Sequence, residues 1–142
     1  MKKLLAIMAV MLSVSGCSAL NWNCGSASDG LSNNDTVYFD FDSSVLRTDA
    51  VETLNKQVPY LKEGNEEIVV SGYADERGTR EYNLGLGERR ASAVAVYLEL
   101  MGVDPARLST VSYGKDNPVD PAHNEEAWAK NRRATTMKVD YE

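Results

Sequence analysis

Cysteine and histidine are scarce in this sequence, which has two Cys and one His in 142 residues. A zinc site needs several such side chains to converge on one point, so little material is left for a His/Cys metal centre. No Ser/His/Asp or Cys/His arrangement for nucleophilic catalysis can be placed in the chain. The single histidine, His123, lies in a proline-flanked segment, and we expect it to have no functional role.

Positive charge is also in short supply, with 15 Lys+Arg against 21 Asp+Glu and a net charge of −6. Such a balance disfavours non-specific binding of DNA or RNA. The apolar run at residues 4–12 is shorter than the ~20 residues that span a bilayer. With 25% charged residues and many spaced apolar ones, the body of the chain is predicted to be globular.

The N-terminus has the pattern of a secretory signal peptide, with two lysines, the apolar run 4–12 and small residues up to Cys17. A buried core helix is the alternative for this run. Residues 14–17, Val-Ser-Gly-Cys, resemble a bacterial lipobox. The resemblance implies cleavage after residue 16, diacylglycerol on the Cys17 sulfur and acylation of the new N-terminus. Ser18 at the next position implies sorting to the outer membrane.

Residues 17–35 are predicted to form the lipidated Cys and a flexible tether, because Ser, Asn, Gly and Asp dominate and no period is sustained. A coil of this length typically reaches ~20–25 Å. Lipidation of Cys17 leaves Cys24 as a lone thiol; without lipidation the two could form a disulfide. From residue 36 to 142 the pattern is regular, and we assign this range to one domain.

Alternating and β-branched segments predict four strands, at residues 36–42, 67–73, 108–113 and 134–141. Apolar residues at steps of three and four predict a helix over 49–62 and a long helix that ends near Gly102. A short helix is possible over 125–130. Pro59 is expected to kink the first helix or end it early. The order β-α-β-α-β-(α)-β predicts an α+β fold, a two-layer α/β sandwich with helices on one sheet face.

Residues 72–94 carry the most specific motif, which includes the run Asp-Glu-Arg-Gly-Thr at 75–79. They resemble the OmpA-like peptidoglycan-binding domain family. Residues 38–42, 111–115 and 131–134 are similar to the peptidoglycan-associated lipoproteins of that family. The resemblance covers residues 36–142 almost completely, and the lipobox and tether fit the same family.

The resemblance implies a ligand, the diaminopimelate of the peptidoglycan peptide stem, whose far end carries an ammonium and a carboxylate. By motif position, Asp75 and Arg90 match the family's diaminopimelate pair, and a guanidinium can hold a carboxylate in a bidentate manner. Phe41 and Asp42 match a region that lines the same pocket, where Asp42 acts through its backbone N–H. Leu86 forms an apolar wall.

Each of these residues also has a structural alternative. Asp75 could cap the following turn, and Arg90 could pair with a helix neighbour at the surface. Phe41 and Leu86 could belong to the core. Arg89, beside Arg90, is expected to face solvent.

Other positions near the motif have different expected roles. Asn83 is expected to fix the junction between the loop and the long helix. Residues 131–133, Asn-Arg-Arg, could form an internal ion pair or contact the ligand. Tyr73 stands where relatives often have another residue, frequently His, so the pocket rim departs from the family pattern.

The family resemblance implies an outer-membrane lipoprotein that binds peptidoglycan non-covalently and tethers the outer membrane to the cell wall, with no enzymatic activity and no cofactor. It further implies a role in the Tol–Pal system of envelope integrity and cell division, with periplasmic TolB as partner. The competing class is a periplasmic hydrolase that acts on the wall. A flagellar-stator-like wall anchor is a third possibility, which requires a retained transmembrane helix.

We predict that Cys17→Ser leaves the protein soluble or unprocessed, because several acyl chains on one residue are what give stable anchoring. Mass spectrometry of the mature N-terminus measures both the cleavage and the acyl groups. Cys24→Ser is the matched control and should keep both. An intact Cys17–Cys24 disulfide in the mature protein would contradict the prediction.

Overall fold

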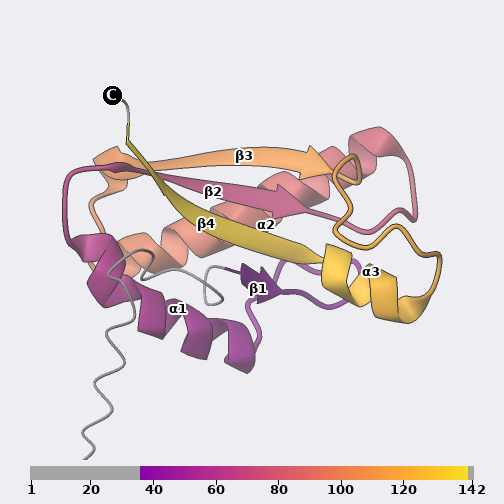
Figure 1. Cartoon of the computed structure of the whole chain (residues 1–142), viewed down its shortest axis with the longest axis horizontal. Helices are drawn as coiled ribbons and strands as arrows, with labels where there is room; N and C mark the ends of the chain where they lie inside the picture. The colour runs from indigo at the N-terminus through magenta and orange to yellow at the C-terminus, as the bar shows by residue number, and fades with distance from the viewer. Residues whose placement is uncertain (1–35, 141–142) are drawn as a thin grey trace, which may run out of the picture.

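The computed structural model describes residues 36–140, so the predicted signal peptide, lipidated cysteine and tether lie outside the described residues. Four strands and three α-helices follow one another in the predicted order (Figure 1). A short 3-10 helix precedes the third strand. The elements are β1 (Thr36–Tyr38), α1 (Thr48–Lys62), β2 (Glu67–Tyr73), α2 (Arg80–Leu100), η1 (Pro105–Arg107), β3 (Leu108–Gly114), α3 (Glu125–Asn131) and β4 (Arg133–Val139).

The strands form one sheet in the order β1-β4-β2-β3. β4 runs antiparallel to both of its neighbours, whereas β2 and β3 are parallel and are connected through α2. The last strand of the chain therefore lies between the first two. This mixed sheet with helices packed on it confirms the predicted α+β class.

One face of the sheet is buried under α1 and α2, which lie together behind and below the strands in Figure 1. On β2, Ile68 and Val70 are fully buried, while the alternate residues Val69 and Ser71 are only half-buried on the other face. The core is made of apolar side chains from the strands and from both long helices: Val37, Phe39, Ala50, Leu54, Val58, Leu61, Ile68, Val70, Ala91, Val94, Leu98, Val103 and Ala134. Within residues 36–140 no helix is long and apolar enough to cross a membrane.

The structure departs most from the sequence prediction at the first strand and at Pro59 in the first helix. The first strand ends at Tyr38 and not at residue 42, because the chain turns out of the sheet and Asp42 takes a positive φ of 51°. The first helix continues through Pro59 to Lys62. Proline removes one helical hydrogen bond, but the turn around it is held by Val58 and Leu61, whose side chains lie in the core.

Both ends of α2 are capped. The Thr79 hydroxyl accepts a hydrogen bond from the backbone N–H of Tyr82 (3.2 Å), which caps the first turn. At the other end Gly102 has φ +97°. Its N–H donates to the Glu99 carbonyl, and the N–H of Val103 donates to the Leu98 carbonyl, as in a Schellman motif.

β2 and α2 approach one another so closely that backbone meets backbone at Gly72 and Gly87. A Cβ added to Gly72 would lie 1.8 Å from the carbonyl oxygen of Gly87, and one added to Gly87 would lie 2.3 Å from the Ser112 Oγ. Neither position has room for a side chain, so the spacing between this strand and this helix depends on both glycines.

We predict that Gly72→Ala destabilises the fold by about 3 kcal/mol or more, at the upper end of the usual cost of overpacking, because the obstructing atoms are backbone. Gly85→Ala is the matched control on α2. A Cβ there meets only the Arg89 side chain at 3.4 Å, so this change should stabilise the helix by about 0.5–1 kcal/mol. Denaturant unfolding measures both, and equal effects would contradict the close-approach argument.

Candidate functional site

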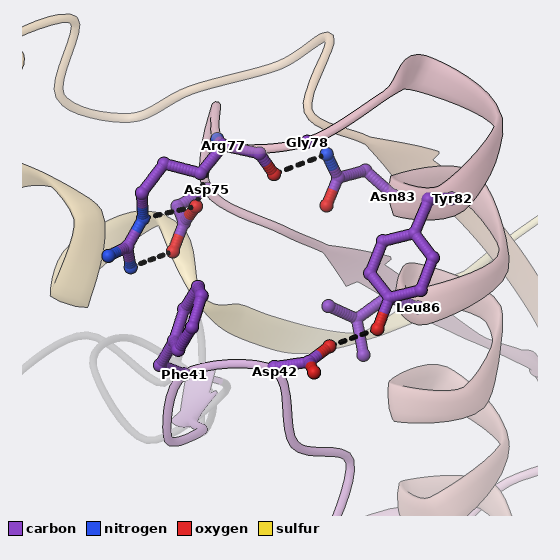
Figure 2. Close-up of a pocket in the computed structure, with 8 residues that line it drawn as sticks. All are labelled: Phe41, Asp42, Asp75, Arg77, Gly78, Tyr82, Asn83 and Leu86. Carbon is purple, nitrogen blue, oxygen red and sulfur yellow. Dashed lines mark hydrogen bonds and ion pairs between the residues drawn. The ribbon is translucent and has the colours of Figure 1, made fainter.

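A pocket opens where the chain leaves β1 and β2 and enters α2 (Figure 2). Its cavity volume is about 190 Å³. The side chains around it come from three separate segments of the chain: Phe41, Asp42, Asp75, Arg77, Gly78, Tyr82, Asn83 and Leu86. Four of the five residues proposed from the sequence, Phe41, Asp42, Asp75 and Leu86, are therefore brought together.

Asp75 is the buried anion of the pocket and is only 4% exposed. Its Oδ1 accepts from the backbone N–H (3.0 Å) and the Nε (3.1 Å) of Arg77, and its Oδ2 accepts from the Nη2 of Arg77 (2.7 Å). Burial alone would raise the pKa of Asp75, but these hydrogen bonds outweigh it and hold the pKa below its usual value. Asp75 is thus ionised at neutral pH. The Asp75 carboxylate accepts a hydrogen bond from the backbone of the following turn, as expected if Asp75 caps that turn, and it also lines the cavity.

The Arg77 side chain lies between two aromatic rings. Its guanidinium carbon is 4.1 Å from the centre of the Phe41 ring and 4.2 Å from that of Trp128. The Trp128 Nε1 donates to a carboxylate oxygen of Glu76 (2.9 Å), which fixes the indole. Phe41 is 60% exposed, so its interpretation as a core residue is wrong, and its ring serves as an outer wall of the pocket.

The opposite side of the pocket is formed by the first turns of α2. Leu86 is 5% exposed and supplies the apolar wall, while the Tyr82 hydroxyl donates to the Asp42 carboxylate across the cavity (Figure 2). The Asn83 amide donates to the carbonyls of Arg77 (2.9 Å) and Thr79 (3.0 Å). The prediction that Asn83 fixes the junction between loop and helix is confirmed.

Arg90 lies behind the pocket and does not line it. Its side chain is completely buried, and its guanidinium donates to the backbone carbonyls of Ser43 (2.8 Å), Tyr73 (2.7 Å) and Asp40 (3.0 Å). Burial lowers the pKa of Arg90 to about 10, so it is a cation at neutral pH. The alternative of a surface ion pair is wrong, whereas Arg89 is exposed as expected.

The other arginines near the pocket make mainly internal contacts. Arg132 Nη1 lies 3.5 Å from Asp75 Oδ2, its Nη2 donates to Glu125 (2.8 Å), and its Nε donates to the Phe39 carbonyl. Arg133 stacks on the Tyr73 ring at 3.7 Å. The internal ion pair expected in residues 131–133 is therefore present at Arg132.

Sequence reasoning missed Arg77, Tyr82 and Trp128. Arg77 carried a usable signal, because it is two residues from Asp75 in a tight turn, where a side chain can reach back to a neighbouring carboxylate. Trp128 carried none, since it reaches the site through contact with a segment 51 positions earlier in the chain (128 − 77). Among residues 36–140 no group of three or more His, Cys, Asp or Glu side chains is placed to hold a metal ion.

Comparisons with known proteins agree with this architecture. A peptidoglycan-associated lipoprotein of Pseudomonas aeruginosa is 52% identical over 103 residues, 72% of this chain and 61% of the relative. One from Brucella melitensis is 41% identical and covers 89% of this chain and 85% of its own length. The crystal structure of the peptidoglycan-associated lipoprotein of Burkholderia pseudomallei matches with a TM-score of 0.70 and 45% identity, over 72% of this chain and 88% of that one.

The C-terminal domain of Helicobacter pylori MotB also matches, with a TM-score of 0.69 and 25% identity over 75% of this chain and 85% of that one. The OmpA family model matches residues 38–132, and the chain belongs to the OmpA family. Within it, the chain is similar to the peptidoglycan-associated lipoproteins. The chain spans about three fifths of the length of the Pseudomonas aeruginosa relative and of a second relative from Pseudomonas putida. The names of these relatives describe no enzyme, which agrees with the prediction of a non-enzymatic protein.

We predict that Asp75→Asn lowers the free energy of unfolding by about 1.5–3 kcal/mol at pH 7, because it weakens charge-assisted hydrogen bonds to Arg77. The folded state lowers the pKa of Asp75, so the ionised carboxylate contributes stability above its ordinary pKa of 3.8 and loses it as the pH falls through the lowered value. The difference between wild type and variant should therefore shrink below about pH 4. Urea unfolding across pH 2–7 measures it, and a constant difference would contradict the assignment.

Proposed function

We propose that this protein binds peptidoglycan through the diaminopimelate of the peptide stem and has no enzymatic activity. The observation that carries the proposal is the pocket itself, in which Asp75, Leu86 and the Phe41–Asp42 segment meet in a member of the OmpA family. A buried carboxylate beside an apolar wall suits an ammonium at the end of a short methylene chain. The names of the relatives, which associate them with peptidoglycan, support the same ligand.

The carboxylate at the far end of diaminopimelate needs a cation, and Arg90 is the residue we assign to it. Within the described part of the chain Arg90 makes hydrogen bonds only to backbone carbonyls and forms no ion pair. A guanidinium has five N–H donors, so three bonds leave two without a protein acceptor. A buried cation without a counter-ion is costly, and a ligand carboxylate that approaches the pocket floor would lower that cost.

The Asp42 backbone is the second polar feature assigned to the ligand. Its φ of 51° turns this segment away from the sheet, between Phe41 and the anchored Ser43. In this role the N–H of Asp42 donates to the ligand carboxylate, while the Asp42 side chain stays bonded to Tyr82.

At the level of the cell, we propose an outer-membrane lipoprotein anchored through acylated Cys17, with residues 18–35 as the tether between the membrane and the wall. The similarity to peptidoglycan-associated lipoproteins supports this placement. We include partnership with TolB and other Tol proteins in this proposal, and the family resemblance supports it.

One experiment distinguishes the proposed non-enzymatic binding of the wall from the competing function, a hydrolase that acts on the wall. Purified protein is incubated with intact peptidoglycan and sedimented. Co-sedimentation without release of soluble fragments supports the proposed tether, and release of fragments supports the hydrolase.

We predict that a stem peptide with Lys in place of diaminopimelate binds the wild-type protein at least tenfold more weakly, because it lacks the far carboxylate. Asp75→Ala should weaken binding of the diaminopimelate peptide by well over tenfold, in line with ~2–5 kcal/mol for truncating one member of a desolvated charge pair. Arg89→Ala is the matched control on α2 and should bind as the wild type does. Isothermal titration calorimetry measures all three.

Folding of each variant is checked by circular dichroism before binding is compared. The two peptides are compared on unmodified protein, so that test does not depend on any variant. Equal affinity of the wild type for the Lys and diaminopimelate peptides would contradict the role given to Arg90.

A further inference from the structure

Both carboxylate oxygens of Asp75 already accept hydrogen bonds within the protein, although Asp75 lines the cavity. Three hydrogen bonds from Arg77 occupy both carboxylate oxygens, and Arg132 approaches the second oxygen to 3.5 Å. A carboxylate has about four lone-pair directions; three of them accept hydrogen bonds from Arg77, and the Arg132 cation lies near the remaining one. An incoming ammonium must therefore take the place of a group that is already there.

Arg77 is the group that an incoming ammonium would have to displace from Asp75. Its side chain is 32% exposed, whereas that of Asp75 is 5% exposed, so Arg77 lies on the solvent side of the carboxylate. Figure 2 shows its guanidinium beside Asp75 and above the Phe41 ring, at the margin of the cavity. Arg132 is 8% exposed and is fixed by a backbone carbonyl and by Glu125, so it cannot leave as easily.

We propose that Arg77 holds the pocket closed in the free protein and that the ammonium of the ligand opens it by replacing the Arg77 guanidinium on Asp75. This inference rests on the proposed function, since it concerns admission of the same ligand to the same pocket. It adds a rule of selection, because a ligand without an ammonium cannot compete for Asp75 and leaves the pocket closed.

The displaced guanidinium has a second anion within reach. Arg77 Nη2 already lies 3.9 Å from Glu125 Oε2, and the Glu125 carboxylate is 66% exposed. The exchange therefore keeps every charge paired: the ligand ammonium pairs with Asp75 while Arg77 moves to Glu125. Only side-chain torsions need to change, and the Arg77 guanidinium leaves its place between Phe41 and Trp128.

The test compares Arg77→Gln and Arg77→Lys with the wild type in binding a synthetic stem peptide that ends in diaminopimelate. We call the Arg77 guanidinium on Asp75 the gate. If this gate is closed in about 90% of molecules, the apparent affinity for the peptide is about tenfold weaker. We expect Arg77→Gln to bind up to about tenfold more tightly and Arg77→Lys to fall between, because one ammonium cannot hold both oxygens of Asp75. Arg80→Gln is the matched control, since Arg80 pairs with Asp116 outside the pocket.

Trp128 reports the movement directly. The chain has two tryptophans, so Trp22→Phe leaves Trp128 as the single tryptophan, which is excited selectively at wavelengths that tyrosine does not absorb. Saturating peptide should shift its emission in the wild-type background and change it little when Arg77 is Gln. A peptide whose diaminopimelate ammonium is acetylated should produce no shift.

Different results would contradict the Arg77 gate and the proposed function. Binding by the wild type that is weakened or unchanged by Arg77→Gln overturns the gate and leaves the proposed function standing. Loss of binding in every variant, the wild type included, overturns the proposed function and the gate with it. Binding by Arg77→Gln alone supports a gate that is closed more firmly than expected.

Discussion

The buried guanidinium of Arg90 holds together the three segments from which the pocket is made. It extends from the middle of α2 and donates to carbonyls on either side of the Phe41–Asp42 segment and at the end of β2. The free energy gained from these hydrogen bonds must offset the cost of burying an unpaired charge, which shows in the lowered pKa of Arg90. Arg90 therefore ties the segment that carries Phe41 and Asp42 to the end of β2, close to Asp75.

Most of the fold could be predicted because its signals are local. The period-two pattern of β2 gave the observed bounds of that strand. The three- and four-residue steps predicted the presence of α2, and Gly102 marked its end. The errors arose where tertiary contacts outweigh local preference. Leu61 anchors the turn beyond Pro59, and the carbonyls of Asp40 and Ser43 turn toward Arg90 and not into the sheet.

The candidate site was predicted only in part, for a similar reason. Asp75 and Leu86 belong to one continuous motif, and their meeting in the pocket follows from a strand-loop-helix unit. The stacking of Arg77 on Trp128 depends on where α3 packs, and no periodicity in the sequence carries that information. Arg90 was expected to bind the ligand carboxylate as the partner of Asp75. The structure shows it fully buried and outside the lining of the pocket, and the motif does not encode how deeply a side chain is buried.

The close approach of Gly72 and Gly87 fixes the distance between β2 and α2, the two elements on which much of the pocket is built. Because the contact is made by backbone atoms, no rotamer change can widen or narrow the gap between β2 and α2. The Phe41–Asp42 segment is likewise held on both sides, because Arg90 donates to the carbonyls of Asp40 and Ser43. The conformational entropy lost when a ligand enters therefore comes almost entirely from side chains, so affinity can be tuned by substitutions at the rim without any change to the scaffold.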